Sequence, residues 1–230
     1  MYAGRLTGAG TISGFSNGVM NTPVGRLEPE VTYAGVYVSR SRGRGLYFDT
    51  VLQYGRYGGR AITFADGQVA DIRGSGGYAS LETGYGFAVA PQLVIEPQFQ
   101  IVAQPQHVQD VTIVNARVSQ VPANTLAGRG GVRIKGDLGS GAFRFQPYVS
   151  VSYWHGLDHH DRTRFSGNGL VTSTIDSGSQ LKAIEYAGGL SVGMGSRFVA
   201  FAQYGKLESI GDSALRNDAK TFSGGLRFAW

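Results

Sequence analysis

The chain has 230 residues, a formal net charge of +5, 36 glycines, no cysteine and only 16% charged residues. The glycines follow no three-residue period and 11% of the residues are aromatic, which excludes a collagen-like fibre and a disordered chain. The lack of cysteine excludes disulfides and thiolate metal sites. No apolar run approaches the roughly 18 residues of a membrane-spanning helix, and Met1–Gly10 has no signal-peptide core.

Alternation of apolar and polar residues with a period of two recurs along the chain. It is clearest in 93–104, where Leu, Ile, Pro, Phe, Ile and Ala fall on one face and mostly Glu and Gln fall on the other. The same pattern is found in 79–89, 126–135, 143–153 and 222–230. We interpret each as a strand with one apolar and one largely polar face, and expect an all-β fold because no comparable helical period is present.

About ten strands are predicted from this pattern, with approximate spans of 1–11, 28–40, 44–64, 72–89, 92–105, 122–137, 142–157, 181–193, 197–208 and 219–230. The connections alternate in length. Very short ones fall at 41–43, 90–91, 138–141 and 194–196, and mostly long polar ones at 12–27, 65–71, 106–121, 158–180 and 209–218. Asp66-Gly67 indicates a two-residue hairpin turn. Short turns at one end and long loops at the other are typical of outer-membrane β-barrels.

The same alternation would also serve a soluble β-sandwich or a lipocalin-like barrel. The polar faces, however, are rich in Gly and Gln rather than Lys and Glu, and they carry charges such as Glu82 and Arg129 in mid-strand. Aromatic residues cluster near the predicted strand ends, as in interfacial girdles. They are Tyr47, Phe48, Tyr54, Tyr57, Tyr85, Phe87, Phe143, Phe145, Tyr153, Trp154, Phe228 and Trp230. These features favour a transmembrane antiparallel up-and-down β-barrel with its apolar face outside.

The last residues form the most specific motif. From Ser223 to Trp230 the chain reads polar-x-Gly-x-x-aromatic-x-aromatic, with Gly225, Phe228 and Trp230 in register. This pattern matches the C-terminal assembly signal of bacterial outer-membrane proteins. The physical basis is edge pairing, in which an extended strand adds to another sheet while alternate side chains fill pockets.

Several segments together resemble a known family, the translocator β-domain of autotransporters (type V secretion). The segments that carry the resemblance are Thr32–Arg40, Gly45–Tyr57, Gly76–Val89, Leu93–Val102, Leu126–Ile134, Phe145–His155 and the terminal GGLRFAW. Each segment alone is weakly specific, but their order and spacing are similar to those of the family along nearly the whole chain.

The resemblance implies a barrel of about twelve strands, preceded by a helix that plugs the pore and by a passenger that crosses the outer membrane. Met1 lies where the family's third strand begins. We therefore expect 1–230 to be a single barrel domain, N-terminally truncated relative to the family by two strands and the plug helix. Such a barrel must close in a different register or leave a seam. The self-cleavage site of some family members lies in the missing part, so no catalytic residue is transferred.

The polar faces of the predicted strands are expected to line the lumen. The residues concerned are Arg5, Asp49, Gln53, Glu82, Glu96, Gln98, Gln100, Arg129, Arg133, Lys135, Arg144, Gln146, Glu185, Gln203 and Arg227. Their mixed signs predict cross-strand ion pairs, with an excess of arginine that makes the channel mildly cationic. In the family such residues contact the plug helix and the passing chain. An equally open interpretation is that they only satisfy one another.

The function expected is that of an outer-membrane translocator barrel in a Gram-negative bacterium, for secretion or display of a passenger. Its expected partners are outer-membrane lipid, the barrel assembly machinery and the passenger, with no nucleic acid, metal or cofactor and no enzymatic activity. The alternatives are a small free-standing porin and an enzyme like the ten-stranded outer-membrane proteases. Asp158-His-His-Asp161 contains the residue types of such a protease. Two Asp and two His in one loop are not facing pairs across a cleft, so we interpret this segment as a solvated loop.

Overall fold

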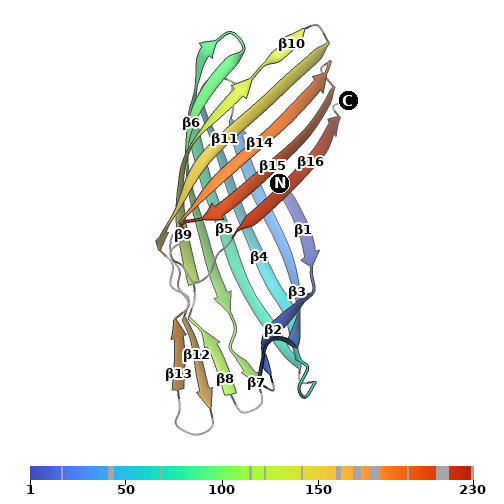
Figure 1. Cartoon of the computed structure of the whole chain (residues 1–230), viewed down its shortest axis with the longest axis vertical. Coiled ribbons are helices and arrows are strands. Elements are labelled where there is room, and N and C mark those ends of the chain that lie inside the picture. The colour runs from blue at the N-terminus through green and yellow to red at the C-terminus, as the bar shows by residue number, and fades with distance from the viewer. Residues whose placement is uncertain are drawn as a thin grey trace.

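The structure is a computed structural model. It describes the chain except for residues 17, 41–43, 68, 114–115, 122, 141, 159–161, 168–171, 177–181, 196, 211–217 and 229–230. All regular secondary structure of the described residues is β-strand (Figure 1). Within that part of the chain, no helix has the length and apolar character to cross a membrane. The predicted all-β antiparallel fold is confirmed.

Ten strands lie on one antiparallel path, in the order β1-β3-β4-β5-β6-β9-β11-β14-β15-β16, among the residues that the structure describes. Their bounds are β1 Tyr2–Thr7, β3 Val19–Arg40, β4 Gly45–Thr63, β5 Val69–Ala90, β6 Leu93–Val108, β9 Ala123–Gly136, β11 Phe143–Asp158, β14 Lys182–Met194, β15 Phe198–Ser209 and β16 Ala219–Phe228. Two short strands extend the same sheet, β2 (Gly10–Ser16) beside β3 and β10 (Leu138–Ser140) beside β11. Most of these strands agree with the predicted spans to within a few residues because they keep the two-residue alternation, but β3 begins at Val19 instead of 28 and β1 ends at Thr7 instead of 11.

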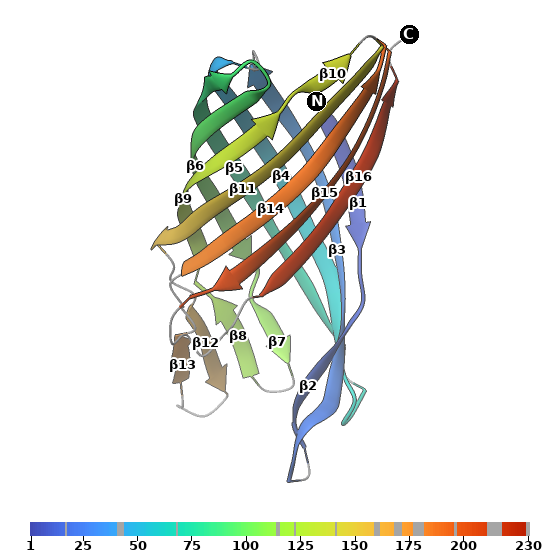
Figure 2. The same ribbon diagram turned by 45° about the horizontal axis from the view of Figure 1, so that its top comes forward.

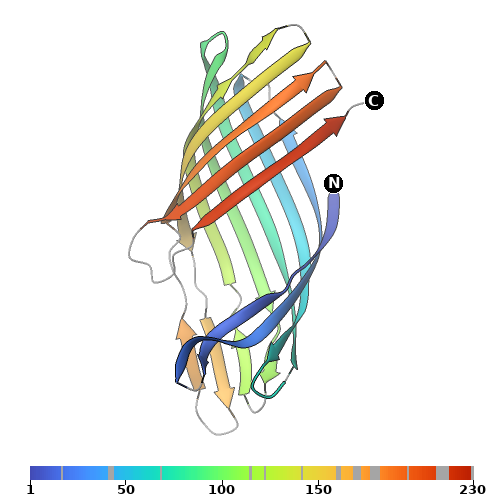
Figure 3. The ribbon, with the colours of Figure 1, turned by 45° about the vertical axis from the view of Figure 1, so that its right-hand side comes forward.

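The sheet curves into a half-barrel that remains open. β1 and β16 stand at the two ends of the strand order, and each is paired on one side only within the described part of the chain. Figures 1 and 3 show these two edge strands on the same side of the molecule. The ten strands therefore leave a seam rather than closing in a different register.

Two long connections that were expected to be loops form a second sheet. It consists of β7 (Val111–Ile113), β8 (Ala116–Gln120), β12 (Arg162–Gly167) and β13 (Thr172–Asp176), in the order β13-β12-β8-β7. Figures 1 and 2 show this small sheet beyond the end of the barrel opposite the C-terminus. The sheet depends on pairing between β8 and β12, which lie far apart in the sequence, and no local pattern reports such a pairing.

Two hairpins are also longer than predicted. The expected connection 12–27 is largely a β2–β3 hairpin that extends past the barrel (Figure 2). The expected two-residue turn at Asp66-Gly67 is wrong, because the β4–β5 ladder ends at the pair Ile62 and Val69. Gly67 has a φ of 67°, and the Thr63 hydroxyl donates to the Asp66 carboxylate, so these residues shape a wider turn.

The two faces of the sheet have an inverted distribution of polarity. Apolar side chains such as Leu52, Tyr54 and Phe99 are 52%, 56% and 52% exposed, whereas Glu96 and Gln98 are buried. No large side chain of the described residues is fully buried, so the sheet encloses no conventional hydrophobic core. We call the exposed apolar side the outer face and the crowded polar side the inner face. A continuous apolar outer face is incompatible with a monomer in water.

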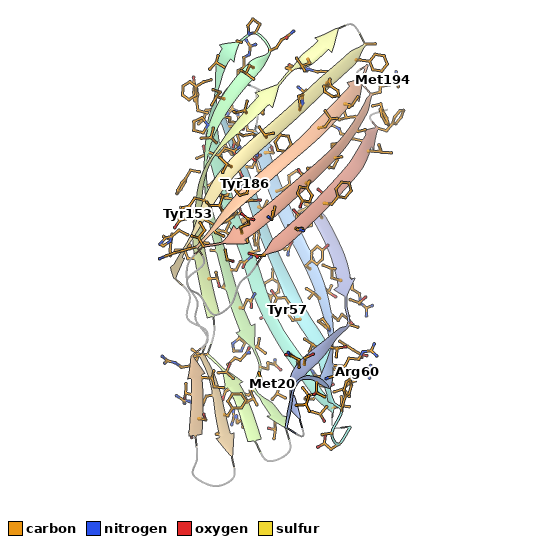
Figure 4. All side chains as sticks on the ribbon, in the orientation of Figure 1. Met20, Tyr57, Arg60, Tyr153, Tyr186 and Met194 are labelled. Carbon is orange, nitrogen blue, oxygen red and sulfur yellow. The ribbon has the colours of Figure 1, made fainter. Side chains whose placement is uncertain are left out.

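Three aromatic residues expected in the interfacial girdles, Tyr47, Tyr57 and Trp154, lie instead on the inner face. Tyr47 is 4% exposed, the Tyr57 hydroxyl covers Gly76, and the Trp154 indole donates to the Glu185 carboxylate. Tyr47 and Trp154 each have an aromatic neighbour in sequence, Phe48 and Tyr153, and successive side chains of a strand point to opposite faces. Only one residue of each pair can therefore face outward. Figure 4 labels Tyr153 and Tyr186, two exposed tyrosines of the outer face on the neighbouring strands β11 and β14.

Tyr47 packs directly over Gly84 on the neighbouring strand. A Cβ at Gly84 would overlap the Tyr47 ring and lie 2.6 Å from the Pro97 carbonyl oxygen. We therefore predict that Gly84→Val lowers the free energy of unfolding by about 1–3 kcal/mol, because the ring must leave its rotamer. Urea unfolding of the barrel in detergent micelles measures this. The control is Gly130→Val, since a Cβ at Gly130 meets nothing within 4 Å. Equal losses in the two variants would contradict the packing argument.

Candidate functional site

The polar residues of the inner face are aligned by the strand register. One row crosses the sheet through Tyr47, Gly84, Gln98, Gly131, Ser152 and Glu185. The adjacent row runs through Asp49, Glu82, Gln100, Arg129 and Trp154. Because directly opposed residues of neighbouring strands share a face, side chains from β4 to β14 converge here.

The first cluster on this face is centred on Arg129. Its guanidinium pairs with Glu82 and lies 3.5 Å from a Glu185 carboxylate oxygen. It also lies 5.3 Å from the centroid of the Trp154 ring, whose Nε1 donates to Glu185 over 2.7 Å. The Arg129 and Glu82 side chains are each only 13% exposed. A cation held by two carboxylates and an aromatic face ties β5, β9, β11 and β14 together.

The second cluster is centred on Glu96, which is 3% exposed. Its carboxylate pairs with the Lys135 ammonium and accepts from Arg133 Nη1 at 3.5 Å and from Gln98 Nε2 at 3.0 Å. Gln98 Nε2 also donates to the Tyr47 hydroxyl oxygen at 2.7 Å, and that hydroxyl donates to Glu82 over 2.8 Å. The two clusters are thus joined through Tyr47.

We call these joined residues the central polar network. It comprises Tyr47, Glu82, Glu96, Gln98, Arg129, Arg133, Lys135, Trp154 and Glu185. Its three carboxylates equal its three cations in number, so it carries no net charge. The expected cationic excess is therefore not found at this level of the inner face. Chemically, the arrangement offers a wall of paired charges joined by hydrogen bonds.

The other predicted lumen residues lie apart from this network. Asp49 faces Glu82 across the strands and has no ion pair among the described residues. Arg144 and Arg227 share a row near the end of the sheet that carries the C-terminus, through Gly193 and Val199. Arg227 has no ion-pair partner among the described residues, whereas Arg144 pairs with Asp137.

The prediction for Arg5 is wrong. Arg5 pairs with Glu30 at 2.8 Å and lies opposite Thr32 on the outer face, because the alternate residues Tyr2 and Gly4 take the inner positions. The sequence reasoning also missed Tyr47 and Trp154 as members of the network. The signal that could have found them is the two-residue period. Tyr47 is two residues from Asp49, and Trp154 is two residues from Ser152, so each shares a face with a polar residue of its own strand.

Asp137 lies in the turn after β9, outside the sheet-spanning strands. The Arg144 guanidinium donates hydrogen bonds of 3.0 and 2.6 Å to its carboxylate and thereby lowers the pKa of Asp137. Because the pKa of Asp137 is lower in the folded protein than in the unfolded chain, its ionised carboxylate stabilises the fold at pH values above the ordinary carboxyl pKa. This contribution is lost as the pH falls through the lowered pKa. We predict that Arg144→Gln raises the pKa of Asp137 toward the ordinary value, as an NMR titration of the carboxyl carbon will show. An unchanged pKa would contradict the assignment.

The C-terminal motif lies partly on the last strand of the sheet. Ser223 faces Gln203, and the Phe201 ring covers Gly225, where a Cβ would lie 2.8 Å from the ring. Phe228 is opposite Phe198 and is 60% exposed on the outer face. Trp230 lies outside the described residues, as do residues 159–161 of the Asp-His cluster and the side chain of Asp158. In the part of the chain that is described, no three His, Asp or Glu side chains group as metal ligands would.

The family profile of the autotransporter β-domain matches residues 4–205. The chain belongs to the autotransporter β-domain family. The resemblance found in the sequence is thereby confirmed, and the chain is a translocator barrel for passenger secretion. The family consists of outer-membrane barrels of Gram-negative bacteria, and its translocator domains are not themselves enzymes.

Solved structures of other autotransporters are similar to this chain. The β-domain of the Bordetella autotransporter BrkA is 24% identical with a TM-score of 0.65, and the match covers 100% of this chain and 83% of that chain. This likeness shows the shared fold. The transport unit of AIDA-I from Escherichia coli is 11% identical with a TM-score of 0.37, over 98% of this chain and 89% of that chain. No curated protein sequence matches the chain.

Proposed function

We propose that this autotransporter β-domain spans the outer membrane as a single barrel domain formed by 1–230. The observation that carries the placement is the inverted polarity of the sheet. Its outer face exposes Leu52, Phe99 and Tyr153, and its inner face buries Glu96 and Gln98. An apolar band flanked by aromatic residues, around a polar interior, is the arrangement that a lipid bilayer stabilises.

The orientation follows from the two kinds of connection. We propose that the short turns, such as 91–92 between β5 and β6, face the periplasm. The small sheet β13-β12-β8-β7 and the β2–β3 hairpin then stand outside the cell. Figure 2 shows both of them at the end of the molecule opposite the C-terminus.

We further propose that the passenger crosses along the inner face. Asp49, Glu82, Glu96, Gln98, Arg129, Arg133, Arg144, Glu185 and Arg227 are the side chains proposed to line that path. The paired charges of the central polar network suit an unfolded polypeptide of any sequence, because a neutral wall neither repels nor strongly retains either sign of charge. On this proposal the barrel has no catalytic activity of its own.

The C-terminal strand supports a proposal about assembly. Among the described residues β16 pairs only with β15, and an unpaired edge can add to the edge of another sheet. We propose that the barrel assembly machinery recognises this strand through Ser223, Gly225, Phe228 and Trp230.

The test of the translocator function places a signal peptide and an epitope-tagged segment before residue 1. We expect an antibody to bind the epitope on intact cells, and protease added outside to remove it. The control lacks β14–β16 and therefore cannot complete the sheet. A folded barrel in the outer membrane with its epitope left in the periplasm would contradict the proposal. If that barrel also let small solutes into vesicles, it would be a porin. If it cleaved added peptides, it would be an enzyme.

A further inference from the structure

The outer face of β3, β4 and β5 changes from apolar to charged within one step of the register. Ala34, Tyr54 and Gly77 lie opposite one another on the three strands. The next outward-facing row toward the external loops is Thr32, Arg56 and Ser75, and the row after it contains Glu30 and Arg73. All these side chains share the face of the exposed Tyr54 because residues two apart on a strand point the same way. We call this three-strand surface the outer wall.

An apolar hollow of about 850 Å³ lies on the uncharged part of the outer wall, around the row of Ala34, Tyr54 and Gly77. Its outward-facing lining residues are small or aliphatic except for Tyr54. They are Met1, Ala3, Ala34, Val36, Leu52, Tyr54, Gly77, Ala79 and Pro105. The alanines and glycine leave a depression between larger neighbours, and its apolar walls match hydrocarbon rather than any polar ligand.

Two polar hollows continue from the apolar one toward the external loops. The first, of about 520 Å³, is also lined by Tyr54 and adds Arg56, Arg73 and His107. The second, of about 500 Å³, is lined by three arginines and three acidic residues, Arg26, Arg60, Arg73, Glu28, Glu30 and Asp71. Figure 4 labels Tyr57 and Arg60, which mark this part of the molecule. The three hollows therefore form one amphipathic surface, apolar at one end and charged at the other, where four arginines lie among three carboxylates.

The arginines of the outer wall are not all neutralised. Arg5 pairs with Glu30 at 2.8 Å, and Arg26 and Arg60 pair with Glu28 at 3.1 and 2.7 Å. Arg56 and Arg73 are exposed and have no ion pair or side-chain hydrogen bond among the described residues. Two free guanidinium groups lie beside the apolar hollow, on its side toward the external loops. They are complementary to a ligand that carries an anionic group next to hydrocarbon. Guanidinium binds phosphate oxygens in a bidentate manner, which favours phosphate as the anion.

We propose that the outer wall binds one phosphorylated acyl lipid of the leaflet nearest the external loops. An acyl chain occupies the apolar hollow, and the phosphate lies against Arg56 and Arg73. The proposal rests on the membrane placement proposed above. It adds a specific lipid site on one side of the barrel to the general contact of the outer face with the bilayer.

The test measures lipid bound to the intact protein in a neutral detergent by native mass spectrometry. The probes are lipid A, which carries phosphates on an acylated disaccharide, and the same lipid after removal of its phosphates. We expect lipid A to bind, and Arg56→Gln/Arg73→Gln to weaken its binding at least about tenfold, as the loss of charge-assisted hydrogen bonds predicts. Lys206→Gln/Lys220→Gln, on the outer face of β15 and β16, is the matched control and should bind lipid A as the unchanged protein does.

A second pair of variants tests the hollow separately. Ala34→Leu/Ala79→Leu fills it with apolar side chains that a lipid-facing surface tolerates, and should also weaken binding. The shift in gel mobility on heating shows that each variant is folded. The proposal is overturned if phosphate-free lipid binds equally, if inorganic phosphate displaces lipid A, or if the arginine variant keeps full binding. Lipid binding needs no passenger, so the two proposals can fail separately. Loss of epitope export with retained lipid binding refutes the translocator proposal alone. Retained epitope export with loss of lipid binding refutes the lipid-site proposal alone.

Discussion

Glu96→Gln should lower the free energy of unfolding of the barrel by about 3 kcal/mol, the scale expected when a buried ion pair loses one partner. Glu96 is 3% exposed and is the counter-charge of both Lys135 and Arg133. The amide of the variant keeps the shape but leaves both cations without a carboxylate. The Nε of Arg133 has no hydrogen-bond partner among the described residues, and apart from Glu96 this guanidinium has the Tyr148 ring, whose centroid lies 5.4 Å away, as a neighbour that stabilises its charge.

Unfolding in urea, followed by tryptophan fluorescence in lipid vesicles, measures this loss. The matched control is Arg144→Gln, which breaks the exposed pair with Asp137 and should have little effect, since exposed ion pairs contribute little. The double variant Glu96→Gln/Lys135→Gln removes one unpaired cation and should recover part of the lost stability. If Glu96→Gln is as stable as the Arg144→Gln control, the central polar network does not hold the inner face together.

Phe228→Ala/Trp230→Ala should reduce the amount of folded barrel in outer membranes at least about tenfold, which corresponds to about 1.4 kcal/mol of lost docking free energy. The physical reason is that alternate aromatic side chains on an unpaired strand anchor it in pockets of the partner sheet. In the half-barrel Phe228 is 60% exposed and contributes little to internal packing. The substitution therefore affects recognition more than the stability of the folded sheet.

The amount of folded barrel is measured by the gel mobility shift on heating of isolated outer membranes. The matched control is Phe222→Ala/Leu226→Ala, which removes two apolar side chains that are 78% and 75% exposed on the same strand. Because Phe222 precedes the motif and Leu226 occupies one of its unspecified positions, the control should assemble much better. Equal defects would mean that assembly depends on the apolar character of β16 as a whole, and unimpaired assembly of the first variant would remove the proposed role of Phe228 and Trp230.

The strands of the barrel were predictable because their environment is simple. Each has one exposed apolar face and one crowded polar face, so the two-residue period is present throughout, as in the predicted 92–105 and the observed β6, Leu93–Val108. The family was also recognisable, because the segments that resemble it have a fixed order and spacing. Glu82, Glu96 and Arg129 lie on the inner face of the sheet, and the prediction that they line a lumen stays a prediction.

Adjacent aromatic residues were assigned less well. Tyr47 and Trp154 were grouped with the girdle because both lie near predicted strand ends, but strand parity turns them inward. The second sheet was missed because its strands come from two loops. Short polar segments such as β8 and β12 become strands only when another loop supplies the hydrogen-bonding partner.

The amino-acid sequence by itself determined the strand periods, the alternation of turns and loops, and which face of each strand is apolar, because these depend only on residues a few positions apart. Only the tertiary structure decided which polar residues meet. Glu96 and Lys135 are separated by 39 residues, and they meet because hydrogen bonding between β6 and β9 sets the register. The same holds for the open seam between β1 and β16 and for the amphipathic outer wall, since both arise from the relative positions of strands and not from any one of them.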